Sequence, residues 1–259
     1  MLPFESQVVE IYEDLHRIAP GALEQFQSLP SANQYRRLYE LTSAHVPSGP
    51  GVTVLDWGCG RGHFTYYLLR RGYRVTAYSL EDPPELFARL PAAERERLTF
   101  VRGEDPAGLP FADGSFDAVF SVGVLEHVRE LGGTEIESLQ EIRRVLRPGG
   151  VLVVYHLPNR FSPIEAVARM RHRRHDPREG FKFHQYRFTA AEISRLSKAA
   201  GLQLRAMGRY GFLPRNSLSR LPASARSSRR VASWINVADF ALERVFSPFT
   251  QNYFFVAAR

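Results

Sequence analysis

A short apolar run followed by three glycines at alternate positions is the feature that most constrains this chain. Residues 52–55 read Val-Thr-Val-Leu, and glycines stand at positions 58, 60 and 62. An apolar β-branched run bounded by turn residues is typical of a buried parallel strand. Glycines remove the Cβ where the backbone must turn tightly or approach a ligand closely. A helix is expected from about residue 62, with its first amides facing an anion or carboxylate. The stretch therefore predicts a ligand site at the carboxyl end of a central strand.

The spacing of these glycines indicates which class of nucleotide ligand the turn could bind. A dinucleotide site requires G-x-G-x-x-G, whereas residues 56–62 read D-x-G-x-G-x-G, and the chain contains no G-x-x-x-x-G-K-[ST] phosphate loop. The pattern resembles motif I of the class I S-adenosylmethionine (SAM)-dependent methyltransferases. Taken alone, it leaves another nucleotide or a structural turn open.

A second motif strengthens the resemblance. Residues 109–117 read L-P-F-A-D-G-S-F-D, residues 125–127 read L-E-H, and residues 146–150 read L-R-P-G-G. These segments follow motif I in the order found in small-molecule members of the family. The resemblance covers roughly residues 50–210 and the last strand. It implies an α/β, doubly wound, seven-stranded and mostly parallel sheet of the Rossmann-like type, with an antiparallel last strand, and SAM as cofactor.

The same resemblance implies a set of cofactor-binding residues. The methionyl end of SAM is assigned to the turn with Asp56, Gly58, Cys59 and Gly60. The ribose is assigned to Ser79 or Glu81 at the end of the second strand, and the adenine to Glu104 or Asp105 at the end of the third. Val122 is expected beside the departing methyl. Ser79 stands where the family has a ribose-binding acid. Glu81 could replace that acid, Ser79 could serve alone, or Glu81 and Asp82 could cap the next helix.

Two histidines are candidate general bases. His127 follows the predicted fourth strand and His156 follows the fifth, so both are expected at the crevice beyond the carboxyl ends of the strands. An imidazole with a near-neutral pKa can remove a proton from a hydroxyl or amine acceptor. Alternatively, His127 serves only in packing, and His156 only bonds to the loop backbone. His184 and Tyr186 could also reach the acceptor.

Composition bounds the remaining possibilities. A chain of 259 residues suits one domain with additions, and its formal charge of +7 permits an anionic partner without identifying one. The single cysteine, Cys59, rules out an intramolecular disulfide framework and a cysteine-cluster metal site, and no metal is predicted. Neither a signal peptide nor an apolar run of about 20 residues is evident, so a cytoplasmic protein is expected.

The pattern of helices and strands predicts four segments. N-terminal helices, about 4–18 and 31–45, lie within residues 1–50, the SAM-binding core spans 51–212, an inserted loop and apolar helix span 213–250, and the last strand spans 251–259. Core packing is the favoured role of the apolar helix, about residues 231–246. An acceptor lid, a homodimer contact and a membrane contact are the alternatives.

The acceptor is the least constrained part of the prediction. We expect methyl transfer to an oxygen of a small molecule such as a metabolite, lipid, quinone or sugar, with nitrogen and carbon acceptors open. The basic segment 169–178 could serve an anionic or membrane-associated acceptor. RNA methylation is an alternative, although no RNA-binding signature is present and nucleic acid is not expected. A non-catalytic regulatory protein with the same fold is the other alternative, because the usual strand-two acid is missing.

Overall fold

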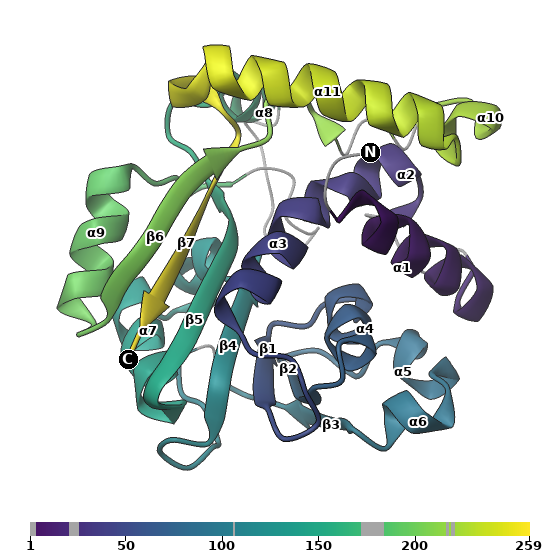
Figure 1. Ribbon diagram of the computed structural model, residues 1–259. Coiled ribbons are helices and arrows are strands. Elements are labelled where there is room, and N and C mark those ends of the chain that lie inside the picture. Colours follow the sequence, from purple (N-terminus) through teal and green to yellow (C-terminus); the bar gives the residue numbers. More distant parts are fainter. Residues whose placement is uncertain (1–3, 21–25, 106, 172–183, 216–217, 219–220) are drawn as a thin grey trace.

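The computed structural model describes residues 4–20, 26–105, 107–171, 184–215, 218 and 221–259. Within these residues, seven strands form one sheet in the order β3-β2-β1-β4-β5-β7-β6 (Figure 1). The strands are β1 (Thr53–Trp57), β2 (Arg74–Ser79), β3 (Leu98–Arg102), β4 (Phe116–Val122), β5 (Leu146–Pro158), β6 (Gln203–Tyr210) and β7 (Asn252–Ala258).

The direction of the strands confirms the predicted fold class. β7 runs antiparallel to β5 and β6, and every other neighbouring pair is parallel. The strand order reverses between β1 and β4, which is the point where doubly wound sheets form a crevice beyond the carboxyl ends of their strands. The protein is therefore an α/β fold with a mostly parallel sheet and an antiparallel last strand.

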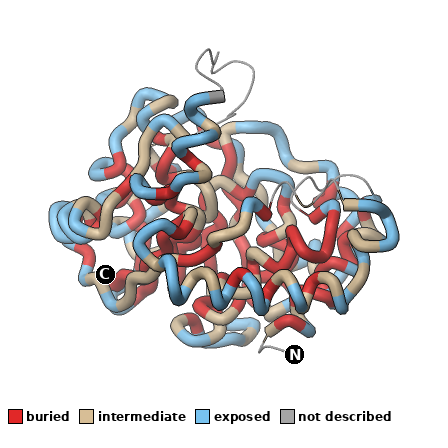
Figure 2. The backbone as a smooth tube through the Cα atoms, turned by 90° about the horizontal axis from the view of Figure 1, so that it is seen from above, coloured by how far each residue is buried: buried red, intermediate tan, exposed pale blue. Residues whose placement is uncertain are grey.

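Both faces of the sheet are covered by helices. Successive residues of β1 point to opposite faces, so Val54 packs in one core cluster with α1, α3 and α4, while Leu55 packs in the other with α7 and α9. Figure 2 shows the buried residues running through the middle of the molecule. The helices are α1 (Glu5–Ile18), α2 (Leu29–Ala32), η2 (Asn33–Tyr35), α3 (Arg36–His45), α4 (His63–Arg70), α5 (Glu85–Arg89), α6 (Ala92–Arg95), η3 (Leu125–Leu131), α7 (Glu135–Val145), α8 (Pro163–Arg171), α9 (Ala190–Ala199), α10 (Ala223–Arg226), α11 (Arg229–Val245) and η6 (Ser247–Phe249).

Two predicted elements differ from the structure. The single helix expected over residues 31–45 is divided into α2, η2 and α3, with Asn33, a residue whose side chain competes with helical backbone bonds, at the break. The fifth strand, expected to end before His156, extends from 146 to 158 and so contains this histidine. Its additional residues pair with Phe116 of β4 and with β7, so backbone pairing rather than hydrophobicity sets its length.

A buried polar network joins the N-terminal helices to α11. The guanidinium of Arg215, a residue only 9% exposed, donates to both Asp239 and Asn236 of α11 and to the carbonyl of Pro30. Asn236 in turn donates to Glu5 of α1. In Figure 1, α11 runs across the top of the molecule above α1 and α2. This network holds the N-terminal helices and α11 together, and we call this group of helices, with Arg215, the roof.

The face that α11 buries is partly polar, which corrects the expectation of core packing. Its buried residues are Ala232, Asn236 and Asp239, whereas Trp234 is 75% exposed and Val237 is 53% exposed. The helix is anchored through the Arg215 network instead of through its large apolar side chains. Among the described residues, no helix is long and apolar enough to cross a membrane.

Candidate functional site

The turn after β1 packs so closely against the segment after β4 that a side chain cannot be accommodated at Gly58. Gly58 has a φ of +76°, and a Cβ there would lie 2.3 Å from Cγ2 of Val124. The backbone amides of Gly58 and Cys59 both donate to the carbonyl of Tyr78. At Gly60, with a φ of +49°, a Cβ would meet no atom within 4 Å. The backbone therefore packs tightly at Gly58 and borders open space at Gly60.

Asp56 brings a buried carboxylate to the same turn. Its Oδ2 accepts a hydrogen bond of 2.6 Å from the hydroxyl of Thr65 in α4. Burial raises the pKa of Asp56 to about 7, although the Thr65 hydrogen bond acts in the opposite direction. A carboxylate with one oxygen held by the protein is suited to bind a cationic group with the other.

A cavity of about 780 Å³ opens beside this turn. It lies within the size range of ligand pockets, roughly 300–1,000 Å³. Its walls come from the turns after β1, β2 and β4, from the end of β5, and from the roof, where they include Gln34, Tyr35, Pro214 and Arg215. The cavity thus occupies the crevice that the strand order predicts.

The predicted ribose and adenine residues occupy different environments. Ser79 and Glu81 both line the cavity, and Oγ of Ser79 accepts a hydrogen bond of 3.1 Å from the amide of Glu81. Glu104 and Asp105 lie at an exposed turn after β3 and do not belong to the described lining of the cavity. Asp105 instead accepts a hydrogen bond from the amide of Ala107.

The structure contradicts the helix-capping alternative for the two acids after β2. The N-cap of α5 is Pro84, and no side-chain capping hydrogen bond is found at this helix start. Asp82 forms an exposed ion pair with Arg102, at 2.6 Å. Glu81 lines the cavity, so it is the acid of this pair that lies where a ligand could bind.

His127 and His156 both line the cavity, and burial lowers the pKa of each. His127 lies in η3, where its Nδ1 is 3.1 Å from a carboxylate oxygen of Glu130, and its pKa is about 4. His156, with an unusual φ of +68°, is held by Tyr210, whose hydroxyl bonds both to its amide and to its Nδ1, and its pKa is about 3. Both imidazoles are therefore neutral near pH 7 and are weak bases.

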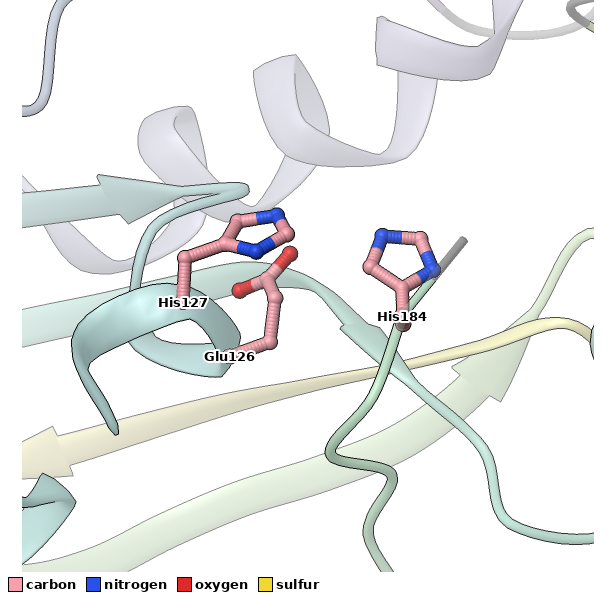
Figure 3. A group of neighbouring side chains, drawn as sticks. All are labelled: Glu126, His127 and His184. Carbon is pink, nitrogen blue, oxygen red and sulfur yellow. The ribbon is translucent and has the colours of Figure 1, made fainter. Parts of the chain in front are cut away.

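A third histidine and two buried glutamates complete this end of the cavity; the histidine was expected to be able to reach the acceptor, whereas neither glutamate was a predicted site residue. His184 lies just before α9, and its Nδ1 is 3.0 Å from a carboxylate oxygen of Glu165 in α8. Burial alone would lower the pKa of His184, but the bond to Glu165 and the charges of the nearby glutamates raise it overall. Burial raises the pKa of Glu126, which stands beside His127, to about 7. Figure 3 shows Glu126, His127 and His184 gathered together.

A second hollow, of about 530 Å³, lies beside α7 and α9 and is rich in arginine. It borders the main cavity, because η3 and α8 contribute residues to both and the lining of the hollow resumes at Gln185, directly after His184. Its five arginines are Arg129, Arg160, Arg169, Arg187 and Arg195. Most of the basic segment predicted over residues 169–178 lies outside the described residues, so the basic surface seen here is built largely from other arginines.

Comparison with known proteins shows that the central part of the chain matches methyltransferases. Residues 55–154 match the family model described as a methyltransferase domain. An uncharacterized methyltransferase of Mycolicibacterium gilvum is 30% identical over 188 residues, covering 66% of this chain and 70% of that protein. A sterol 24-C-methyltransferase of Gibberella zeae is 37% identical over 110 residues, covering 41% of this chain but only 28% of the relative.

A solved structure extends the similarity over nearly the whole chain. It is the 1,6-didemethyltoxoflavin-N1-methyltransferase of Burkholderia thailandensis, with its substrate and S-adenosylhomocysteine bound. The TM-score is 0.52 and the identity 22%, and the match covers 98% of this chain and 86% of that one. At this identity the likeness concerns the fold.

Proposed function

The chain belongs to the class I SAM-dependent methyltransferases, and we propose that it transfers the methyl group of SAM to an oxygen of a small-molecule acceptor. One observation carries the proposal: a single cavity reaches from the glycine turn to the histidines and glutamates beyond β4. A methyl donor at one end and an acceptor at the other would share one enclosure, which is the arrangement that direct transfer needs.

The residues at the glycine turn fit the cofactor. The open space at Gly60 admits a ligand close to the backbone, and the buried carboxylate of Asp56 suits the ammonium group of the methionyl end. Gly58 and Cys59 shape the turn, Ser79 and Glu81 would hold the ribose, and Val122 would border the methyl, since all five line the cavity. Glu104 and Asp105 stay candidates for the adenine amino group from their exposed turn. SAM supplies an electrophilic methyl group on a positively charged sulfur.

The opposite end of the cavity suits a hydroxyl acceptor. A hydroxyl must lose its proton when its oxygen is methylated, and it can donate a hydrogen bond to a carboxylate or a neutral imidazole. Glu126 and His127 offer such acceptors at the wall of the cavity. The low pKa of His127 and of His156 argues against either acting alone as the base. We therefore assign His127 to holding the acceptor and His156 to shaping the wall near the roof.

The test is to identify the atom that receives the methyl. Purified protein is incubated with SAM carrying a deuterated methyl group and with a panel of phenols, quinols, sugars and lipid alcohols. Release of S-adenosylhomocysteine and an O-methylated product, located by mass spectrometry and NMR, are expected. Labelling only of nitrogen or carbon acceptors from a matched panel would overturn the choice of oxygen while leaving the enzyme class intact.

One observation favours RNA as a second candidate acceptor. The five arginines of the hollow beside α7 and α9 could contact phosphates. RNA binding would then weaken steeply with salt, and the double variant Arg160→Gln, Arg195→Gln would reduce that salt dependence by about two phosphate contacts. Filter binding at several salt concentrations measures both effects, and the absence of salt-sensitive binding removes this candidate.

A further inference from the structure

Three potential ligand atoms converge at the acceptor end of the cavity. One atom each from Glu126, His127 and His184 lies within 4.8 Å of the others. The side chains come from separate parts of the chain, η3 and the segment just before α9, and Figure 3 shows them facing a common space. Ligands bound tetrahedrally to an ion at about 2.1 Å lie roughly 3.4 Å apart, so side-chain rotation suffices to close the group around one ion.

Glu126 supplies an independent reason to expect a ligand there. Its residue is 2% exposed, and within the described part of the chain its Oε2 has no hydrogen-bond partner. A buried carboxylate oxygen without a partner is costly, and buried charges in proteins are normally paired or bound to a metal. The oxygen is thus placed where a cation would satisfy it.

The two histidines are oriented as metal ligands usually are. Nδ1 of His127 is 3.1 Å from Glu130, and Nδ1 of His184 is 3.0 Å from Glu165. A metal-bound histidine typically gives its other ring nitrogen to a carboxylate, which fixes the tautomer and the ring orientation. Here both histidines have that supporting carboxylate, which assigns the remaining nitrogen, Nε2, to the ion.

The local charge balance also favours a cation. The side chains of Glu130 and Glu165 are each only 5% exposed, so with Glu126 three carboxylates surround two imidazoles. Carboxylates therefore outnumber the histidines in a region with little access to water, and a divalent ion could pair with the carboxylate of Glu126, which neither histidine holds through Nδ1.

We propose that Glu126, His127 and His184 bind one divalent transition-metal ion, of the series from Mn²⁺ to Zn²⁺, at the acceptor end of the cavity. Imidazole ligands favour this series over Mg²⁺ and Ca²⁺, which prefer sites made of oxygen alone. Three protein ligands leave at least one position open toward the cavity, as catalytic metal sites do.

The ion gives the acceptor oxygen a definite role, and this step rests on the proposed function. An acceptor hydroxyl bound at the open position would be more acidic than in water, so it would release its proton to solvent water more readily. The oxygen electron pair forms the bond to the methyl carbon, the carbon–sulfur bond breaks, and its electrons stay on sulfur in S-adenosylhomocysteine. The substrate class is therefore an alcohol, phenol or enol that can coordinate a metal through oxygen.

The test is direct metal binding by the full chain. Protein freed of metal by chelation is titrated calorimetrically with Mn²⁺ and with Zn²⁺, and the Co²⁺ form is examined by visible absorption for histidine ligation. Wild type is expected to bind one ion saturably. Glu126→Gln and His184→Gln are expected to weaken binding at least tenfold, while His45→Gln, at the end of α3 outside the described cavity lining, is expected to leave it unchanged.

Controls separate this inference from the proposed function. SAM affinity is measured in the same variants and should be retained, which shows that they are folded. Glu165→Gln, which keeps all three proposed ligands but alters the support of His184, should weaken metal binding about tenfold. Absence of saturable binding by wild type, or equal binding by the ligand variants, overturns the metal site. Metal binding without any O-methylation overturns the proposed function alone, whereas O-methylation unaffected by complete chelation overturns the role assigned to the ion.

Discussion

The two ends of the cavity are built in different ways. The cofactor end comes mainly from one continuous turn, residues 56–62, supported by the turn after β2. The acceptor end combines Glu126 and His127 of η3 with Glu165 of α8 and His184 before α9. The first is encoded locally, and the second exists only when distant segments meet. Substitutions at the two ends should therefore have different consequences.

The largest expected effect comes from breaking the roof. Arg215→Met leaves Asp239 and Asn236 of α11 without their buried partner, so we expect the protein to lose about 3–5 kcal/mol of unfolding free energy. Arg229→Met is the matched control, because Arg229 forms an exposed ion pair with Glu13, and such pairs contribute roughly 0–1 kcal/mol. Denaturant unfolding measures both. Equal losses in the two variants would contradict the structural importance of the roof.

The next effect breaks the cofactor end alone. Gly60→Val places a branched side chain at the border of the cavity and should weaken SAM binding at least a hundredfold, about 2.7 kcal/mol. Gly72→Val is the matched control, because Gly72 also has a positive φ and open surroundings but does not line the described cavity. Calorimetric titration with SAM compares them. Similar losses would mean that backbone strain, not ligand contact, explains the effect.

A smaller effect should appear as a pH dependence of SAM affinity. Because burial raises the pKa of Asp56 to about 7, its carboxylate is mostly ionised at about pH 7.5 and mostly protonated at about pH 6. Only the ionised form attracts the ammonium group of SAM, so affinity should fall roughly eightfold between these values as the pH is lowered. Calorimetry over this range measures the change. Asp56→Asn should bind weakly with a nearly flat profile, and the same slope in both proteins would exclude Asp56 as the source.

The smallest effect sharpens the assignment of the ribose end. Glu81→Gln removes a carboxylate from the cavity wall and should weaken SAM binding by about fivefold, roughly 1 kcal/mol. Asp82→Asn, next in sequence but paired outside with Arg102, should leave the affinity unchanged. If instead only the Asp82 variant loses affinity, the assignment between the two acids is reversed. No loss in either variant would leave Ser79 as the ribose contact.

The fold was predictable because its signals are local. Each of these signals is a short continuous segment: the apolar run before Gly58, the motif over residues 109–117, and the L-R-P-G-G segment. The seven-stranded sheet and the SAM-dependent class are confirmed. The expected packing of α11 was wrong because its apolar composition did not reveal that Arg215, 24 residues before Asp239 in sequence, would anchor the helix through polar side chains.

The acceptor end could be predicted only in part. The L-E-H segment drew attention to His127, and His184 was expected to be able to reach the acceptor, but its place beside Glu126 and His127 was not foreseen and Glu165 was not considered. No spacing rule joins residues 126, 165 and 184, because α7, β5 and α8 lie between residues 126 and 184 in sequence. Similarly, a near-neutral pKa was expected for His127, but its pKa in the folded protein is about 4, because burial disfavours the charged imidazole.

The sequence by itself determined the class of fold, the enzyme family and the turn that faces the cofactor, because strand period, glycine positions and helix signals act over a few residues. Tertiary structure alone decided which acid after β2 faces the cavity, which polar side chains hold the roof, and which histidines and glutamates meet at the acceptor end. The physical reason is range: backbone conformation follows from neighbours in the chain, whereas desolvation, pairing of buried charges and convergence of ligands depend on segments that only folding brings together.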